Sequence, residues 1–203
     1  MMQILKISVY LIISGYRNMD LRIQKTRQLL KDALVSLTLE NGYDHVTIKD
    51  ITKRASVGYN TYFRHYKSKE ELLHILLMDG FEKLTPMLIE SKQNEDVLEN
   101  EKRLFNFISN NERLIRVLFE SCADLLYEQT KNKIMTGELN NIGFTKLKDE
   151  LEPLEYDYIV CQFVQSTLTS IRWWLTHKDD ISIVQMAKFN QKTIGHFMQW
   201  KQV

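Results

Sequence analysis

Apolar residues recur at helical spacing along almost the whole chain. The first segment of this kind runs from about Arg22 to Glu40, and its predicted apolar stripe consists of Ile23, Leu29, Leu30, Ala33, Leu34 and Leu37. Gly42 is expected to end this helix, because glycine readily takes the left-handed conformation that follows a helix. Since the 203 residues include only seven glycines and two prolines, we predict an all-α fold.

The stretch from Val46 to Lys69 predicts two short helices joined by a tight turn, followed by the start of a third helix. Thr47 can cap the first helix in partnership with Asp50, three residues later. Val46 and Ile51 flank this cap at the positions where a hydrophobic staple would close the helix entry. Both signals place a helix start at Thr47.

The turn between the two helices is predicted at residues 56–58, where Gly58 can serve both as backbone pivot and as cap of the next helix. That helix, Tyr59 to about Tyr66, offers little to a core, because only Tyr62 and Tyr66 continue the apolar face that Val57 begins. Its other side chains are aromatic, amide, hydroxyl and cationic groups: Tyr59, Asn60, Thr61, Phe63, Arg64 and His65. A short helix with this surface suits the major groove of DNA.

The residue types and spacing of this region resemble the N-terminal domain of the TetR (tetracycline-repressor) family of transcription regulators. The resemblance covers roughly residues 22–85 and rests on Thr47-Ile48-Lys49-Asp50-Ile51, Ala55-Ser56-Val57, Thr61-Tyr62-Phe63-Arg64-His65-Tyr66 and Lys67-Ser68-Lys69-Glu70-Glu71-Leu72. It implies a helix-turn-helix DNA-binding domain over residues 20–85 and a helical effector-binding and dimerisation domain over residues 86–203. The competing interpretation is three core helices of an unrelated bundle.

The resemblance also implies which side chains touch the DNA backbone. Thr47 is expected to contact a phosphate at the start of its helix, where free N–H groups favour anions. Lys69 is expected to do the same at the start of the fourth helix. Arg64 and His65 are expected to contact phosphates as well, which would fix the register of the protein on DNA without reading sequence.

Base reading is expected at the N-terminal turn of the recognition helix, from Tyr59, Asn60 and Thr61. Asn60 could bond adenine through both amide atoms, and the methyl group of Thr61 could contact a thymine methyl. The family usually has tyrosine at the position of Phe63, which here lacks the phosphate-binding hydroxyl. We therefore expect Phe63 to pack against a sugar or a thymine methyl.

Charge is unevenly distributed along a chain whose net charge is only +1. Residues 22–69 carry ten Lys and Arg residues and four acidic residues, a net charge of +6. From Pro86 onward the chain carries fourteen Lys and Arg residues and seventeen acidic residues, a net charge of −3. This distribution is expected for a phosphate-binding head on a body that does not bind DNA.

The fourth helix is predicted from Lys69 to about Leu84, with a second capping box between Ser68 and Glu71. Pro86 is expected to end or kink it. By resemblance, this helix transmits effector binding to the head. The polar run from Ser91 to Glu95 is expected to be the linker between the two domains.

Helical periodicity returns in the body near residues 97–109, 112–119, 123–135, 156–177 and 182–200, with a loop at 137–143. Large or polarizable side chains in the middle segments are candidates for an effector pocket: Phe105, Phe119, Cys122, Leu126, Tyr127 and Phe163. Their chemistry predicts an apolar or aromatic, weakly polar ligand. The alternative is that these side chains are packed core.

The last two segments have wide apolar faces that could form a four-helix interface in a homodimer. The predicted interface residues are Ile171, Trp174, Ile194, Phe197 and Met198. In addition, residues 163–175 resemble a C-terminal domain type that is common in this family in low-GC Gram-positive bacteria.

Residues 1–19 are interpreted as an extension or a mis-assigned start, because the apolar run from Ile4 to Ile13 is too short to span a bilayer. A membrane anchor is the alternative. Cys122 and Cys161 are interpreted as reduced core thiols of a cytoplasmic protein. No spacing of His and Cys suggests a metal site, so neither a metal nor a cofactor is expected.

The sequence as a whole predicts a cytoplasmic, homodimeric regulator that binds double-stranded operator DNA. It is expected to be a repressor released by a small-molecule effector whose identity the sequence does not reveal. The alternative is a coactivator that works through a protein partner without binding an operator. We do not expect an enzyme, because the sequence contains no Gly-rich phosphate loop, nucleophile elbow or metal motif.

Overall fold

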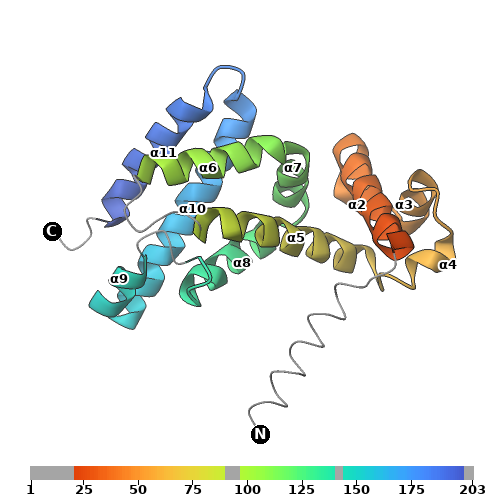
Figure 1. Cartoon of the computed structure of the whole chain (residues 1–203), viewed down its shortest axis with the longest axis horizontal. Coiled ribbons are helices and arrows are strands. Elements are labelled where there is room, and N and C mark those ends of the chain that lie inside the picture. Colours follow the sequence, from red (N-terminus) through yellow and green to blue (C-terminus); the bar gives the residue numbers. More distant parts are fainter. Residues whose placement is uncertain (1–20, 90–96, 140–143, 199–203) are drawn as a thin grey trace, which may run out of the picture. The chain divides into compact units, whose positions relative to one another are not determined.

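The computed structural model of the chain describes residues 21–89, 97–139 and 144–198 (Figure 1). Every regular element in these ranges is helical, which confirms the predicted all-α fold. The chain divides into two compact units, Met1–Leu72 and Leu73–Val203. The division falls inside helix α5 (Lys69–Ile89), ahead of the predicted linker, which lies outside the described residues. We describe each unit separately.

The first unit consists of α2 (Leu21–Asn41), the 3-10 helix η1 (Tyr43–His45), α3 (Ile48–Arg54), α4 (Tyr59–Tyr62) and the start of α5. Helix α2 contacts η1 and α3, and α3 contacts α4. Figure 1 shows α2, α3 and α4 as a small cluster of red to orange helices. The unit therefore has the order expected of a helix-turn-helix domain.

The buried stripe of α2 is narrower than predicted. Its buried residues are Leu30, Ala33, Leu34, Leu37 and Thr38. Ile23 and Leu29 were assigned to this stripe wrongly, because their side chains are 37% and 40% exposed. Leu29 lies about 100° around the helix from Leu30, which places it beside the core-facing stripe.

Local hydrogen bonds define the end of α2 and the start of α3 as predicted. Gly42 has a φ of 79°, and its N–H donates to the Thr38 carbonyl at 2.8 Å. The Thr47–Asp50 capping box is present in both directions: the Thr47 N–H donates to Asp50 Oδ2 at 3.0 Å, and the Asp50 N–H donates to Thr47 Oγ1 at 3.3 Å. These bonds satisfy N–H groups that a helix start leaves free.

The turn between α3 and α4 pivots on Ser56, and the prediction that Gly58 is the pivot was wrong. Ser56 has a φ of 54°, whereas Gly58 has an extended backbone with φ −61° and ψ 141°. The Val57 N–H donates to the Thr52 carbonyl at 2.9 Å and the Ser56 N–H to the Lys53 carbonyl at 3.2 Å. This pair of bonds is a Schellman motif, which requires a left-handed residue at the position of Ser56. Gly58 does cap α4, as predicted.

Helix α4 is shorter than the predicted Tyr59–Tyr66 span and ends at Tyr62. Beyond it, the Arg64 N–H bonds the Thr61 carbonyl at 3.2 Å, the His65 N–H bonds the Tyr62 carbonyl at 2.8 Å, and the chain turns. Tyr62 and Tyr66 are 0% and 2% exposed, which confirms the predicted inward face.

Helix α5 differs from its prediction at both ends. The Glu71 N–H donates to Ser68 Oγ at 3.2 Å, so Ser68 caps the helix, but the Glu71 carboxylate accepts from the Lys67 N–H instead of closing the box on Ser68. At the other end, α5 continues through Pro86 to Ile89. A proline this near the helix end removes only one backbone hydrogen bond, the one its own N–H would have made.

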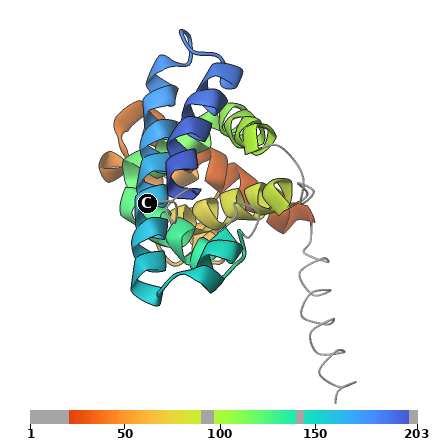
Figure 2. The ribbon, with the colours of Figure 1, turned by 90° about the vertical axis from the view of Figure 1, so that its left-hand side faces the viewer.

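The second unit contains the rest of α5 together with α6 (Val97–Asn110), α7 (Glu112–Ser121), α8 (Ala123–Met135), α9 (Phe144–Glu150), α10 (Pro153–His177) and α11 (Ile183–Met198). Helix α10 contacts α7, α8, α9 and α11, and α11 also contacts α6. In Figures 1 and 2, α10 runs through this unit as its longest helix. Helix α9 follows the predicted loop and was not anticipated from the sequence.

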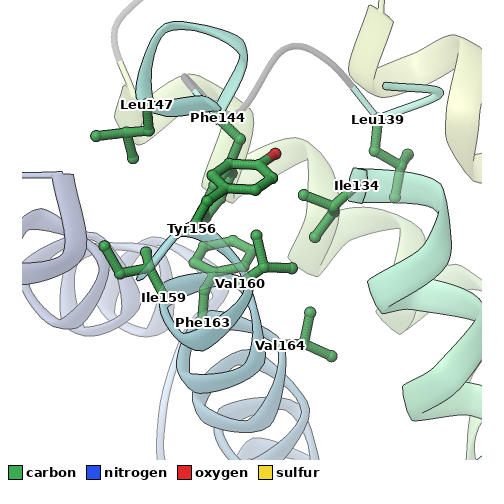
Figure 3. Packing of buried hydrophobic residues seen from close by; sticks show 9 residues of the cluster. All are labelled: Ile134, Leu139, Phe144, Leu147, Tyr156, Ile159, Val160, Phe163 and Val164. Carbon is green, nitrogen blue, oxygen red and sulfur yellow. The ribbon is translucent and has the colours of Figure 1, made fainter. Parts of the chain in front are cut away.

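Two apolar clusters lie along α10. The first cluster joins its N-terminal half to α8 and α9, and Figure 3 labels its nine buried residues. Within it, the rings of Phe144 and Phe163 meet with centroids 4.6 Å apart. The second cluster joins its C-terminal half to α6 and α11 and contains Phe105 and Trp174 at 5.3 Å. Leu168 packs against both clusters. None of the described helices combines the length and the apolar character that crossing a bilayer requires.

The Ser56 pivot predicts that Ser56→Gly will stabilise the protein. Glycine occupies the left-handed conformation without the steric cost of about 1–2 kcal/mol that serine bears there, and its larger loss of backbone entropy on folding offsets about 0.5–1 kcal/mol of this gain. We therefore expect the free energy of unfolding to rise by about 0.5–1 kcal/mol in urea titrations.

The matched control for this experiment is Gly58→Ala. The backbone of Gly58 is accessible to alanine, and an added Cβ would meet Thr61 Oγ1 at 3.4 Å, an ordinary contact. The change in stability should stay below about 1 kcal/mol. Strong destabilisation by Gly58→Ala, with no gain from Ser56→Gly, would instead place the pivot at Gly58.

Candidate nucleic-acid interface

Helix α4 presents a polar and aromatic surface on top of two buried tyrosines. Tyr59 and Phe63 are 47% and 46% exposed, and Asn60 and Arg64 are exposed as well. Thr61 and His65 are half-buried. The residues predicted to face DNA thus share one surface, and the two side chains predicted to anchor the helix lie beneath it.

The two exposed aromatic rings of this surface are in contact. Tyr59 and Phe63 meet edge to face with ring centroids 5.2 Å apart, and Phe63 also meets the buried Tyr62 at 5.5 Å. Edge-to-face pairs of this kind contribute about 0.5–1.5 kcal/mol beyond the area they bury. Phe63 therefore holds the Tyr59 ring in place, a role that sequence reasoning did not assign to it.

Cationic groups gather beside His65. Burial is the main cause that lowers the pKa of His65, and the nearby Arg27 of α2 and Arg64 lower it further. The imidazole is therefore neutral at pH 7, and positive charge at this point comes from the two arginines. Arg27 is added to the candidate contact residues here, because the fold brings it close enough to His65 to act on its charge.

Two other polar groups of the head are already engaged within the protein. Arg54 donates from both terminal nitrogens to Glu40, at 2.7 and 2.6 Å, which ties the end of α3 to the end of α2. Thr47 is exposed, but its hydroxyl bonds Asp50 at 2.5 Å. These hydrogen bonds lower the pKa of Asp50, so its carboxylate stays ionised and keeps the cap in place.

Lys69 lies in a different environment from the one expected of a phosphate ligand. Its ammonium donates to the carbonyls of Tyr43 and Val46, at 2.8 and 2.9 Å, and lies 4.0 Å from the centroid of the Tyr43 ring. These contacts connect the start of α5 to the segment between α2 and α3. Sequence reasoning could not find them, because the partners lie 26 and 23 residues away.

The predicted effector-pocket residues divide between the two clusters along α10. Phe105 is fully buried in the α6–α10–α11 cluster, against which Phe119 packs. Phe163 belongs to the α8–α9–α10 cluster (Figure 3). Tyr127 packs against this cluster. Leu126 is buried and Cys122 is half-buried. Phe105 and Phe163 therefore belong to different core clusters, and the effector pocket of these six residues stays a prediction.

The predicted dimer interface needs correction at two positions. Ile171 and Trp174 are 6% and 2% exposed within the single chain, and the Trp174 indole N–H donates to the Ile181 carbonyl at 3.0 Å. They belong to the core of the second unit, so a partner chain could not reach them. The side chains of Ile194, Phe197 and Met198 lie outside the described residues.

The two cysteines are free thiols, as predicted, but neither is fully buried. Burial raises the pKa of Cys122 to about 11, so this thiol stays protonated at neutral pH. Within the described ranges, no group of three or more His, Cys, Asp or Glu side chains is arranged to hold a metal ion.

Comparisons with known proteins agree with the geometry of the head. Residues 30–76 match the family described as bacterial regulatory proteins, tetR family. The chain is similar to YxbF of Bacillus subtilis (strain 168), an uncharacterized HTH-type transcriptional regulator, with 33% identity over 96 residues. That alignment covers 46% of this chain and 25% of YxbF, so the chain spans about a quarter of that relative.

Solved structures resemble the chain over most of its length. A putative TetR-family transcriptional regulator from Syntrophomonas wolfei superposes with a TM-score of 0.68 at 22% identity, over 86% of this chain and 95% of that one. A TetR transcriptional regulator from Streptococcus agalactiae superposes with a TM-score of 0.63 at 24% identity, over 86% and 96%. At these identities the structures share the fold. The helix-turn-helix head, residues 30–76, thus matches the tetR family of bacterial regulatory proteins, and the chain shares its fold with these solved structures.

Proposed function

We propose that the protein is a DNA-binding transcriptional regulator and that α4 enters the major groove of its operator. The observation that supports this most is the surface of α4 and of the turn that follows it, where Tyr59, Asn60, Phe63 and Arg64 are exposed while Tyr62 is buried. Amide, aromatic and guanidinium groups on one short helix match the donors, acceptors and methyl groups of base edges.

Base reading and backbone binding fall to different side chains in this proposal. Asn60 reads a base, because its exposed amide can donate to and accept from adenine at once. Arg27 and Arg64 supply positive charge for phosphates beside a neutral His65. Thr47 remains a candidate phosphate contact through its exposed position at the start of α3.

In this proposal, Lys69 stabilises the fold of the DNA-binding head and does not itself contact DNA. Its two bonds to main-chain carbonyls fix the segment that leads from α2 into the capped start of α3. A lysine held in this way affects DNA binding through the position of Thr47. This replaces the direct phosphate contact that the family resemblance implied.

We further propose that the regulator is a homodimer that pairs through the outward faces of α10 and α11. One exposed stripe of α10 includes Leu154, Tyr158 and Trp173, and α11 exposes Val184 and Phe189. The three exposed side chains of α10 lie on the side of that helix away from its buried stripe, which contains Ile171 and Trp174. A two-fold pair of such faces suits a pseudo-palindromic operator with half-sites about 34–36 Å apart.

Control by a small molecule completes the proposal: an effector that prefers the unbound regulator releases it from DNA, as a repressor requires. By linkage, the effector must bind the DNA complex more weakly by the same factor by which it weakens DNA binding.

Selection of bound sequences from random duplex DNA tests whether the protein binds a specific operator. Two variants, at Asn60 and Arg64, test which side chain reads a base and which one binds phosphate. Asn60→Ala should relax preference at one base pair and cost about 1–3 kcal/mol on the best site. Arg64→Ala should weaken binding to all sequences and lower the salt slope by about one unit. If the purified protein selects no sequence and shows no salt-dependent duplex binding, the coactivator interpretation is favoured instead.

Lys69→Ala should reduce the free energy of unfolding by about 1–3 kcal/mol, because two hydrogen bonds from a charged group are lost. The control is Lys67→Ala, whose side chain is exposed and whose effect on stability should stay within about 0.5 kcal/mol. Urea titrations of both variants measure the difference. Unchanged stability, together with a salt slope lowered by about one unit, would restore Lys69 as a phosphate ligand.

Phe189→Glu should shift the protein from dimer to monomer in sedimentation at micromolar concentration, since a carboxylate would be desolvated in the proposed interface. Leu39→Glu is the matched control, because Leu39 is 37% exposed and belongs to α2 of the first unit, outside the two helices of the proposed interface. A Phe189→Glu protein that sediments as a dimer would place the interface elsewhere.

A further inference from the structure

The thiol of Cys161 lies in a group of polar side chains where α8 packs on α10. The Lys131 ammonium of α8 lies 2.9 Å from Asp157 Oδ1 of α10. The Cys161 thiol donates to the other oxygen of the same carboxylate, Asp157 Oδ2, at 3.8 Å. One carboxylate therefore connects an ammonium and a thiol, which the contact between α8 and α10 brings together.

Two side chains of α8 are hydrogen-bonded to the sulfur of Cys161. The hydrogen bond with Cys161 is the main cause that raises the pKa of Tyr127 to about 12, and burial adds to it. The pKa of Lys131 is raised first by its hydrogen bond with Asp157 and then by one with Cys161. Tyr127 and Lys131 are one helical turn apart on α8, so both can reach the same sulfur.

This arrangement has the parts of an activated nucleophile. A nucleophile of this kind bonds a base, and a third group holds the base in position. Here Cys161 is the nucleophile, the Asp157 carboxylate accepts its proton, and Lys131 holds the carboxylate. A cation and a hydroxyl donor beside the sulfur also stabilise the negative charge that develops there when the thiol attacks.

The group lies at the surface of the second unit, where a small reagent needs no cavity. Cys161 is half-buried, and the side chains of Lys131 and Asp157 are 24% and 39% exposed. The second cysteine offers a comparison within the same chain. Burial raises the pKa of Cys122 from 9.0 to about 11, so about a hundredfold less of that thiol is ionised at neutral pH.

We propose that Cys161 is a covalent modification site, whose thiol adds to small, soft electrophiles that carry an activated carbon–carbon double bond. Compounds of this class are α,β-unsaturated aldehydes, ketones and amides. The site lies in the second unit, and the proposal does not rest on the DNA-binding function proposed above. It changes the interpretation of Cys161 from a core thiol to a reactive one.

The reaction is an addition in which every atom is retained. The Cys161 sulfur forms a bond to the β-carbon of the electrophile, and the π bond between the α- and β-carbons breaks. The electron pair of that π bond takes up a proton at the α-carbon, which replaces the proton that the thiol gave up by way of Asp157. The product is a thioether, and the step needs neither an oxidant nor a leaving group.

Acrylamide, a small neutral compound of this class, tests the proposal on the full chain, with its saturated analogue propionamide as the control. Mass spectrometry of the digested protein measures the rate of adduct formation at each cysteine. At pH 7.5, Cys161 should react on the order of tenfold faster than Cys122. In urea the two rates should agree within about twofold, because the folded environment is lost. Propionamide should leave both thiols unmodified.

Lys131→Met should slow the alkylation of Cys161 about fivefold, because a unit positive charge next to the sulfur is lost. Lys131→Arg keeps the charge and should restore most of the rate. The matched control is Lys188→Met, which removes the same charge from an exposed position on α11 and should react as the unaltered chain does.

Three results would overturn the proposal: no adduct at Cys161 in the folded chain, a rate at Cys122 equal to or above that at Cys161, or an unchanged rate in Lys131→Met. The comparison of the two cysteines uses the unaltered chain, so it decides the matter even if a variant does not fold. A chain that is alkylated at Cys161 but binds no DNA would refute the proposed function and leave this site intact.

Discussion

The proposed DNA-facing surface depends on the burial of Tyr62. A helix of four residues cannot hold itself together in water, because nucleation costs more than so few hydrogen bonds return. Tyr62 is fully buried, packs against Tyr66 with ring centroids 5.7 Å apart, and donates its hydroxyl proton to the Ser68 carbonyl at 2.8 Å. That bond ties α4 to the residue that caps α5, so both helices are positioned by one side chain.

Features set by neighbouring residues could be predicted from the sequence. The Thr47–Asp50 box and the inward face of Tyr62 and Tyr66 follow from spacings of three and four residues, which a helix converts directly into contacts. The residue that takes the left-handed conformation in the turn between α3 and α4 could not be predicted from such spacings. Ser56 and Gly58 can both occupy such a turn, and which of them takes the left-handed position depends on where α3 ends.

Features set by distant residues could not be predicted. The periodicity of 156–177 identifies a buried stripe, but it does not say whether the stripe packs on its own chain or on a partner, and Trp174 turned out to be core. Lys69 finds its carbonyl partners more than twenty residues away. Glu101 looks like any charged residue of an amphipathic helix until α11 covers it.

The carboxyl group of Glu101, only 5% exposed on α6, also bears on how long the protein survives. An unfolded Glu101 titrates at its ordinary pKa of 4.5, while the folded one titrates near 7. Its contribution to stability is therefore fully present below about pH 4.5 and is lost as the pH rises to about 7. At neutral pH the chain therefore unfolds more often than at mildly acidic pH, and proteases that act on unfolded protein cleave it faster.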